Sequence, residues 1–296
     1  METKSFLGNL TLLITAFVWG VAFVAQTVGN VVGPFTFQAS RYILGGLVLL
    51  PVIFITDAIA KKNGTYKKSD KKMLLKGGII CGLFLCISTG FQQVGLNYTT
   101  VGKAGFITAL YVIIVPIMGI FVKKKVSPRI WFCTAISVVG LYLLCMTDKV
   151  FSLSTGDILI FCCAIGCAFH IMVIDRYIPY VNGIKLSCIQ FFVAGIISIP
   201  LSIFEQPTVE GIMSAWLPIA YAGFISSGVG YTLQIIGQKY TKPAIASMLM
   251  SLESVFAVLA AAVLLNQIPS MRESVGCIVM FVAIIIAQLP EKEVKN

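Results

Sequence analysis

Long stretches without charged side chains recur along the chain, and each is about long enough to cross a lipid bilayer. A hydrocarbon core about 30 Å thick requires roughly 20 predominantly apolar residues in a helix. Charges are scarce in such stretches because an ionised group at mid-bilayer costs about 2.5 kcal/mol or more. The pattern therefore predicts ten membrane-spanning segments joined by short polar connections.

The charges between these stretches locate the predicted spans. In chain order the spans lie within Ser5–Ser40, at Pro34–Thr56, between Lys76 and Lys103, between Lys103 and Lys123, between Arg129 and Asp148, after Asp157, between Lys185 and Glu205, within Gly211–Gln238, from Pro243 onward, and at Ser274–Leu289. Strands of a β-barrel would alternate apolar and polar positions, whereas Ile278–Ala287 is apolar on every face. The predicted fold class is therefore an all-α polytopic membrane protein with ten transmembrane helices.

The composition strengthens this prediction. Hydrophobic residues make up 58% of the 296 residues and charged residues only 11%, whereas soluble domains average about 25% charged. This balance excludes an aqueous enzyme and a disordered chain. The net charge of +10 must lie outside the bilayer core, so it does not indicate a nucleic-acid partner. The lysine-rich segment 57–76 is predicted to be a cytoplasmic loop beside acidic lipid headgroups.

The placement of lysine and arginine predicts the orientation, because basic residues in short loops stay on the cytoplasmic side. Counting the predicted loops alternately places eighteen basic residues on one side and two, Lys149 and Arg272, on the other. Both termini, including the tail 290–296, are therefore expected in the cytoplasm, with the protein in the plasma membrane. The first apolar stretch lacks a cleavage pattern and is interpreted as a span.

Nine cysteines occur in the chain, most of them within predicted spans. They are interpreted as small apolar side chains. Cys162, Cys163 and Cys167 are close in sequence, but they have no partner at a recognisable metal-ligand spacing. We therefore expect no disulfide framework, no metal and no other cofactor.

The two halves of the chain repeat one pattern weakly. Gly95–Thr99 corresponds to Gly237–Thr241, and Gly46 with Pro51 corresponds to Gly195 with Pro200. Two related units, residues 5–147 and 155–289, would each contain five spans. Because five is odd, the second unit would enter the membrane from the opposite side. The repeat therefore predicts inverted five-helix units, an arrangement that permits alternating access.

The chain resembles the drug/metabolite transporter superfamily, and specifically its EamA-type members. The similar segments are Ala16–Phe23, the pair Arg41-Tyr42, Gly95–Ala104 and Ser251–Ala257. This resemblance implies ten helices and transport of small metabolites, but it does not identify the transported solute. At Ser254 the family often has proline, so the serine predicts a straighter ninth span. Ser226–Gly230 and Pro116 predict bends in the eighth and fourth spans.

Glu253 is the most informative single residue. It lies about ten residues into the ninth span, and at about 1.5 Å per residue this places it about 15 Å deep. A carboxylate at that depth is expected to face the interior of the bundle. Its candidate roles are proton coupling and binding of a solute's ammonium group. The alternative is a structural carboxylate that is hydrogen-bonded to Ser251 or Ser254.

Arg41 is predicted to lie about 10 Å inside the second span. A guanidinium group there can bind a carboxylate or phosphate through two parallel hydrogen bonds. The alternative is that the side chain reaches back to the membrane surface. His170, the single histidine, is a second candidate for proton coupling because imidazole titrates near neutral pH. Its alternative role is structural.

Neutral polar and aromatic side chains in the spans predict the lining of a solute cavity. The candidate solute-binding residues are Trp19, Arg41, Gln93, Tyr111, Ser227, Tyr231 and Glu253. For each neutral residue of this set, the alternative is interhelical packing or hydrogen bonding.

The repeat and the resemblance together predict a secondary transporter, specifically an exporter, of small organic metabolites, amino-acid-like solutes or amphipathic drugs. No Walker-type phosphate-binding loop is present, so energy would come from the solute gradient or from a coupled proton or other ion. An intramembrane enzyme acting on a lipid or another small amphiphile is the alternative. A single histidine and the lack of paired embedded carboxylates argue against that enzyme. The sequence leaves a homodimer open.

Overall fold

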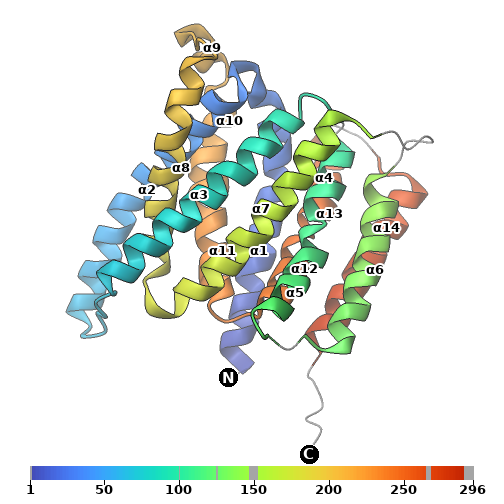
Figure 1. The fold of residues 1–296 in the computed structure, drawn as a ribbon, viewed down its shortest axis with the longest axis horizontal. Helices are drawn as coiled ribbons and strands as arrows, with labels where there is room; N and C mark the ends of the chain where they lie inside the picture. The colour runs from blue at the N-terminus through green and yellow to red at the C-terminus, as the bar shows by residue number, and fades with distance from the viewer. Residues whose placement is uncertain (1, 100, 125, 147–152, 265–267, 290–296) are drawn as a thin grey trace, which may run out of the picture.

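The structure, a computed structural model, describes residues 2–99, 101–124, 126–146, 153–264 and 268–289 (Figure 1). These residues form helices and short connections and contain no strand. Ten segments within the described ranges are long and apolar enough to cross a membrane. The predicted fold class is therefore confirmed. The predicted tail 290–296 and Lys149 lie outside the described residues.

Seven of the spans are single helices, and three are divided. The undivided helices are α1 (Glu2–Gly29), α2 (Pro34–Lys62), α3 (Lys71–Gly95), α6 (Pro128–Cys145), α7 (Thr155–Tyr177), α8 (Gly183–Ile203) and α14 (Met271–Gln288). The divided spans are α4 (Val101–Ala109) with α5 (Tyr111–Phe121), α10 (Trp216–Ala220) with η3 (Tyr221–Tyr231) and α11 (Thr232–Gln238), and α12 (Pro243–Met250) with α13 (Glu253–Leu264). The short helices η1 (Asn30–Val32), η2 (Ile178–Tyr180) and α9 (Val209–Ser214) lie in connections.

Several helices extend beyond the predicted spans because their ends are well capped. The predicted loop 57–76 is largely helical, since α2 runs to Lys62 and α3 begins at Lys71. The carboxylate of Asp70 accepts hydrogen bonds from two backbone N–H groups in the first turn of α3. At the start of α14, Ser270 and Glu273 form a reciprocal capping box. This box begins the helix at Met271, three residues before the predicted start.

The ninth span is broken, so the prediction of a straighter helix is wrong. α12 ends at Met250 and α13 begins at Glu253. Ser251 Oγ donates to Met248 O at 2.8 Å, a bond between side chain and backbone that favours bending of a helix. The fourth span is interrupted at Leu110 rather than at Pro116, which lies inside α5. In the eighth span, Ser226–Gly230 lies in the π-helical segment η3.

The helices of the first five spans pack against those of the last five. The principal pairs are α2 with α8, α3 with α7, and α6 with α14 (Figure 1). At the α6–α14 crossing, a methyl group added to Gly140 would lie 2.7 Å from Met280 Cγ. One added to Gly276 would lie 2.8 Å from Gly140 O. Glycines on both helices therefore permit close backbone approach, as is common between membrane helices.

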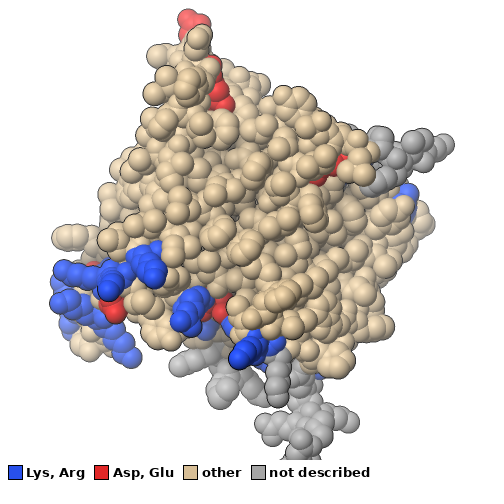
Figure 2. All heavy atoms as spheres, viewed as in Figure 1, with Lys and Arg blue, Asp and Glu red and all other residues tan. Residues whose placement is uncertain are grey.

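Basic residues gather at one end of the bundle. Figure 2 shows Lys and Arg along the lower edge and almost no charged side chain across the middle of this face. We call this edge the lysine-rich end; it includes Lys61 at the end of α2, Lys124 after α5, Lys185 at the start of α8 and Lys239 after α11. α1 begins and α14 ends there (Figure 1). The distribution fits a bundle with an apolar belt and a basic rim.

The other end carries a contact that joins the two halves. Glu205, after α8, accepts hydrogen bonds from Phe35 N at 2.9 Å, Thr36 N at 2.8 Å and Thr36 Oγ1 at 2.7 Å. Its carboxylate therefore caps the N-terminus of α2, which has no capping side chain of its own at Gly33. Negative charge at this position also complements the helix dipole.

We expect Glu205→Ala to lower the stability of the folded protein by about 1 to 2 kcal/mol, because the first N–H groups of α2 would lose their acceptor. The measurement is thermal unfolding of the purified protein in detergent. Glu210→Ala is the matched control, since Glu210 is exposed in the first turn of the short helix α9. Equal unfolding temperatures for the two variants would contradict the capping role of Glu205.

Candidate functional site

A small cavity lies in the middle of the bundle, between the two halves of the chain. Its lining residues are Trp19, Phe23, Gln26, Arg41, Leu85, Ser88, Thr89, Gln92, Thr108, Tyr111, Cys167, His170, Ile171, Ser226, Tyr231, Gln234, Met250 and Glu253. The cavity volume is about 50 Å³, which accommodates a few water molecules but not an organic solute. Binding of a solute would therefore require the surrounding helices to separate.

Two helix breaks meet at this cavity. Tyr111 is the first residue of α5 and Glu253 is the first residue of α13, so each stands where its span is interrupted. Tyr111 Oη donates a hydrogen bond to Glu253 Oε1 at 3.3 Å. Interrupted membrane helices commonly supply binding groups near mid-bilayer, because their half-helix ends present polar backbone atoms.

Arg41 and Glu253 bring opposite charges to the same cavity. The exposed fraction is 3% for Arg41 and 5% for Glu253. Neither forms an ion pair with another residue in the described part of the chain. Because an uncompensated charge is costly at this depth, the pair marks the cavity as a place where a charged ligand would gain favourable partners.

Hydroxyl and aromatic groups orient Arg41. Its Nη2 donates to Tyr42 Oη at 2.9 Å, and its guanidinium carbon lies 4.6 Å from the centre of the Tyr42 ring. Tyr42 Oη in turn donates to Thr89 Oγ1 at 3.1 Å. Arg41 Nε is buried and has no hydrogen-bond partner among the described residues. The guanidinium group is thus held in place while one of its donors is left for a ligand.

An aromatic wall closes one side of the cavity. The rings of Trp19 and Tyr231 are 4.5 Å apart, and Trp19 Nε1 donates to Ser226 O at 3.4 Å. The Tyr231 ring also lies edge-on to His170, with centroids 6.2 Å apart. His170 Nε2 is 3.0 Å from Gln190 Oε1. Aromatic faces of this kind pack against apolar or cationic parts of a solute.

The structure brings together six of the eight residues that the sequence singled out as binding or coupling candidates. Trp19, Arg41, Tyr111, His170, Tyr231 and Glu253 line the cavity. The other two candidates, Gln93 and Ser227, do not line it. The residues directly before them, Gln92 and Ser226, line the cavity instead.

Gln93 and Ser227 serve contacts between helices. Gln93 Nε2 donates to Gln26 O at 3.2 Å and to Asn30 Oδ1 at 3.1 Å. Ser227 is fully buried, and its Cβ lies 2.9 Å from the position of a methyl group added at Gly45. Both residues therefore contact neighbouring helices directly, and the structure does not place either of them at the cavity.

Gln26 is a lining residue that the sequence candidates omit. It is 6% exposed, and its Oε1 atom has no hydrogen-bond partner in the part of the chain that the structure describes. The Oε1 atom of Gln234, which also lines the cavity, likewise has no partner in that part of the chain. Buried polar atoms are usually paired, so these two acceptors are available to hydrogen-bond donors of a solute. An amide side chain within the apolar first span was the available signal for Gln26.

The described residues contain no group of three or more His, Cys, Asp or Glu side chains placed to hold a metal ion. The cavity instead offers one guanidinium group, one carboxylate, amides, hydroxyls and aromatic rings. These groups suit reversible binding of a polar organic molecule.

The fold is similar to that of a solved protein. A crystal structure described only as that of a protein superimposes with a TM-score of 0.76, covering 95% of this chain and 96% of the other, at 18% sequence identity. At this identity the likeness concerns the fold alone.

Two further comparisons concern the sequence. A protein of Archaeoglobus fulgidus described as an "Uncharacterized transporter" is 30% identical over 288 residues, which cover 97% of this chain and 87% of the relative. The sequence pattern of the EamA-like transporter family matches twice, at residues 6–146 and 154–288. Together these matches span nearly the whole chain and confirm the resemblance. The protein is therefore a multi-pass membrane transporter that belongs to the EamA-like family.

Proposed function

We propose that the protein is a secondary-active exporter of small zwitterionic, amino-acid-like solutes, and that it works by alternating access. The observation that carries this proposal is the presence of Arg41 and Glu253 in one cavity without an ion pair between them. A solute with a carboxylate and an ammonium group would neutralise both. Hydrogen bonds between oppositely charged groups are about twice as strong as neutral ones, so this solute class gains most from the site.

The two halves support an inverted arrangement of residues 5–147 and 155–289. Thr99, the last residue of the Gly95–Thr99 motif, donates to Asp157 near the start of α7. Thr241, which ends the matching motif, donates to Asn9 near the start of α1 at 2.9 Å. Each motif therefore bonds to the first helix of the other half. Inverted repeats produce such reciprocal contacts at opposite ends of a bundle.

A second pair of contacts supports the same symmetry. A methyl group on Gly46 of α2 would lie 3.1 Å from Phe192 of α8, and one on Gly195 of α8 would lie 2.8 Å from Ile43 of α2. Gly46 and Gly195 are matched positions in the two halves. Tyr111 and Glu253 begin the second parts of the two matching divided spans, so their hydrogen bond also joins corresponding places.

The reciprocal contacts suggest how access could alternate. At the end opposite the lysines, Thr99 and Lys103 both contact Asp157, with the Lys103–Asp157 ion pair at 3.7 Å. At the lysine-rich end, the Asn9–Thr241 bond is neutral. Opening one of these contacts while the other stays closed would expose the central cavity to one compartment at a time.

Orientation and direction follow from the charges. Basic residues are retained on the cytoplasmic side. We therefore propose that the protein lies in the plasma membrane with its lysine-rich end and both termini facing the cytoplasm. Solute for export would enter from that side. The partners are the lipid bilayer and the solute. Glu253 is the proposed proton-coupling group and His170 is the alternative, since they are the titratable carboxylate and imidazole lining the cavity.

The direct test is counterflow of labelled amino acids in proteoliposomes. Saturable, time-dependent exchange of the label supports a carrier. Absence of exchange for every amino acid tested would overturn the proposed solute class.

For Glu253→Gln, we expect the apparent affinity for a transported amino acid to fall about 10- to 100-fold, because a charge-assisted bond to the ammonium group is lost. The hydroxy acid of the same skeleton, which has no ammonium group, should lose much less. Competition with the labelled amino acid in counterflow measures both affinities. Equal losses for the two solutes would show that Glu253 does not contact the ammonium group.

The same variant tests coupling when the solute is saturating, so that weaker binding is compensated. If Glu253 carries the coupled proton, solute-driven proton movement across the vesicle membrane disappears in Glu253→Gln and persists in His170→Gln; the reverse result would assign the coupled proton to His170. Glu210→Gln, which changes an exposed carboxylate, is the control for both measurements.

For Arg41→Gln, we expect the opposite selectivity. Affinity for the amino acid should fall about 10- to 100-fold because the guanidinium–carboxylate bond is lost, whereas the corresponding amino acid amide should be affected much less. Arg272→Gln, at an exposed arginine that contacts the Tyr142 ring, is the control. Similar losses for the acid and the amide would assign Arg41 to folding rather than to carboxylate binding.

A further inference from the structure

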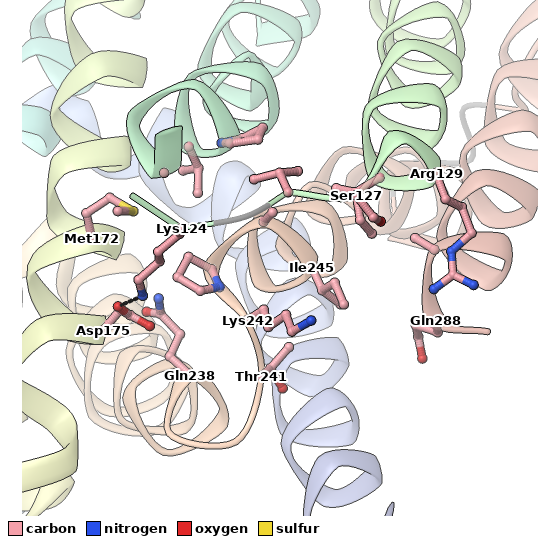
Figure 3. A pocket seen from close by; sticks show the side chains of 18 of the residues that line it. Lys124, Ser127, Arg129, Met172, Asp175, Gln238, Thr241, Lys242, Ile245 and Gln288 are labelled. Atoms are coloured by element: carbon pink, nitrogen blue, oxygen red, sulfur yellow. Dashed lines mark hydrogen bonds and ion pairs between the residues drawn. The ribbon is translucent and has the colours of Figure 1, made fainter. Parts of the chain in front are cut away.

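A second and larger pocket opens near the lysine-rich end, about one helical turn from the central cavity. Its volume is about 720 Å³, which is within the range of small-molecule sites. Tyr111 and Gln234 line the central cavity, and Val115 and Gln238, each four residues further along the chain, line this pocket. Figure 3 shows that its walls come from several helices. We call it the basic pocket.

Positive charge dominates the basic pocket. Four basic residues, Lys124, Arg129, Lys239 and Lys242, line it together with the acidic residue Asp175. Lys124 forms an ion pair with Asp175, drawn as a dashed line in Figure 3. The side chain of Lys242 forms no ion pair or hydrogen bond with another residue in the described ranges. Its ammonium group is therefore available to an anion that enters the pocket.

The N-terminus of α12 is a second feature of the pocket that favours a bound anion. Lys242, Pro243, Ala244 and Ile245 line the pocket, and no side chain in the described ranges caps this eight-residue helix. By contrast, oxygen-bearing side chains accept from the first N–H groups of α2, α3, α7, α8 and α14. A helix N-terminus with open N–H groups and a partial positive charge favours bound anions.

Gln238 supplies an independent indication of a ligand. It is 3% exposed and lines the pocket, and its Nε2 donates to Ile171 O at 3.1 Å. This bond fixes the orientation of the amide, so the atom left without a partner within the described ranges is the acceptor Oε1. In Figure 3 the amide end of Gln238 lies beside Lys124 and Asp175. A buried acceptor without a partner calls for a hydrogen-bond donor from a ligand.

We propose that the basic pocket is a second binding site, separate from the central cavity, for an anionic group that also carries a hydrogen-bond donor. Lys242 and the N-terminus of α12 bind the anion, and Gln238 Oε1 accepts from the donor. A phosphate group that retains one proton has both features, as does a carboxylate with a neighbouring hydroxyl or amino group. The proposal does not depend on which solute the central cavity carries.

Two sources present this chemistry at the lysine-rich end: a small phosphorylated or carboxylated molecule in solution, and the headgroup of an anionic lipid. Lysines near a cytoplasmic membrane surface attract both. Both sources would bind through the same contacts. The experiment therefore distinguishes them by whether an anionic lipid displaces soluble phosphate from the pocket.

Inorganic phosphate is the probe. Saturable binding to the purified full-length protein in detergent is measured by phosphorus NMR line broadening at fixed ionic strength. We expect Lys242→Gln to weaken binding about threefold to tenfold, because a charge-assisted hydrogen bond is lost at a partly exposed site. Lys62→Gln, at an exposed lysine of the same end that does not line the pocket, should leave binding unchanged.

Asp175→Asn provides a test that misfolding cannot mimic. Removing the carboxylate releases Lys124 from its ion pair and deletes a negative charge from the pocket wall. Phosphate should therefore bind about threefold to tenfold more tightly. A variant that unfolds would lose binding instead.

The experiment is repeated in phosphatidylcholine nanodiscs with and without phosphatidylglycerol. Undiminished phosphate binding with the anionic lipid present assigns the site to a soluble ligand, and displacement by that lipid assigns it to a headgroup; both support the site. Absence of saturable binding would overturn the proposal. So would equal affinities in Lys242→Gln, Lys62→Gln and Asp175→Asn.

Discussion

Two buried charges of opposite sign impose the main constraint on this protein. Arg41 and Glu253 lie in membrane-spanning segments, and each is at most 5% exposed. A charge in contact with lipid would cost several kcal/mol, so the bundle must enclose both groups and supply polar neighbours. Tyr42 and Thr89 do this for Arg41, and Tyr111 does it for Glu253. The cavity that results is polar in the middle of an apolar bundle.

The packing of the helices encloses these two charged side chains. Helices of one half pack against those of the other, so the cavity lies at the boundary between the halves rather than inside either one. The breaks before Tyr111 and Glu253 interrupt the fourth and ninth spans at the same boundary. Because Tyr111 and Glu253 both line the cavity, movements of one half against the other would change its volume.

The sequence predicted the number and type of the spans because charges are excluded from lipid. This exclusion leaves long stretches of sequence without charged residues. It also identified Arg41, Tyr111 and Glu253, since polar or charged residues in an apolar span need an inward position. It did not predict the break in the ninth span, which occurs at Ser251–Leu252 without proline. The capping contacts that start α3 and α14 before their predicted first residues were also not predicted.

Finer positions could not be read from the sequence because they depend on the rotation of each helix. Successive residues of an α-helix point about 100° apart, so Gln92 and Gln93 face different neighbours although both are amides. The directions of the Ser226 and Ser227 side chains are harder still to predict, because the π-helical segment η3 has a different rotation per residue from a regular α-helix. The Glu205 contact with α2 joins residues about 170 positions apart and has no local sequence signal.

In alternating access, the two ends of the bundle open in turn around one cavity. Spin labels at the exposed positions Tyr98 and Ile158 report on one end, and labels at Tyr240 and Leu10 report on the lysine-rich end. Distance distributions from the two labelled pairs are recorded in lipid with and without a transported amino acid. If the ends open in turn, solute shifts the two distances in opposite directions. Distances that increase together, as in an open channel, or that do not respond to solute would contradict alternating access.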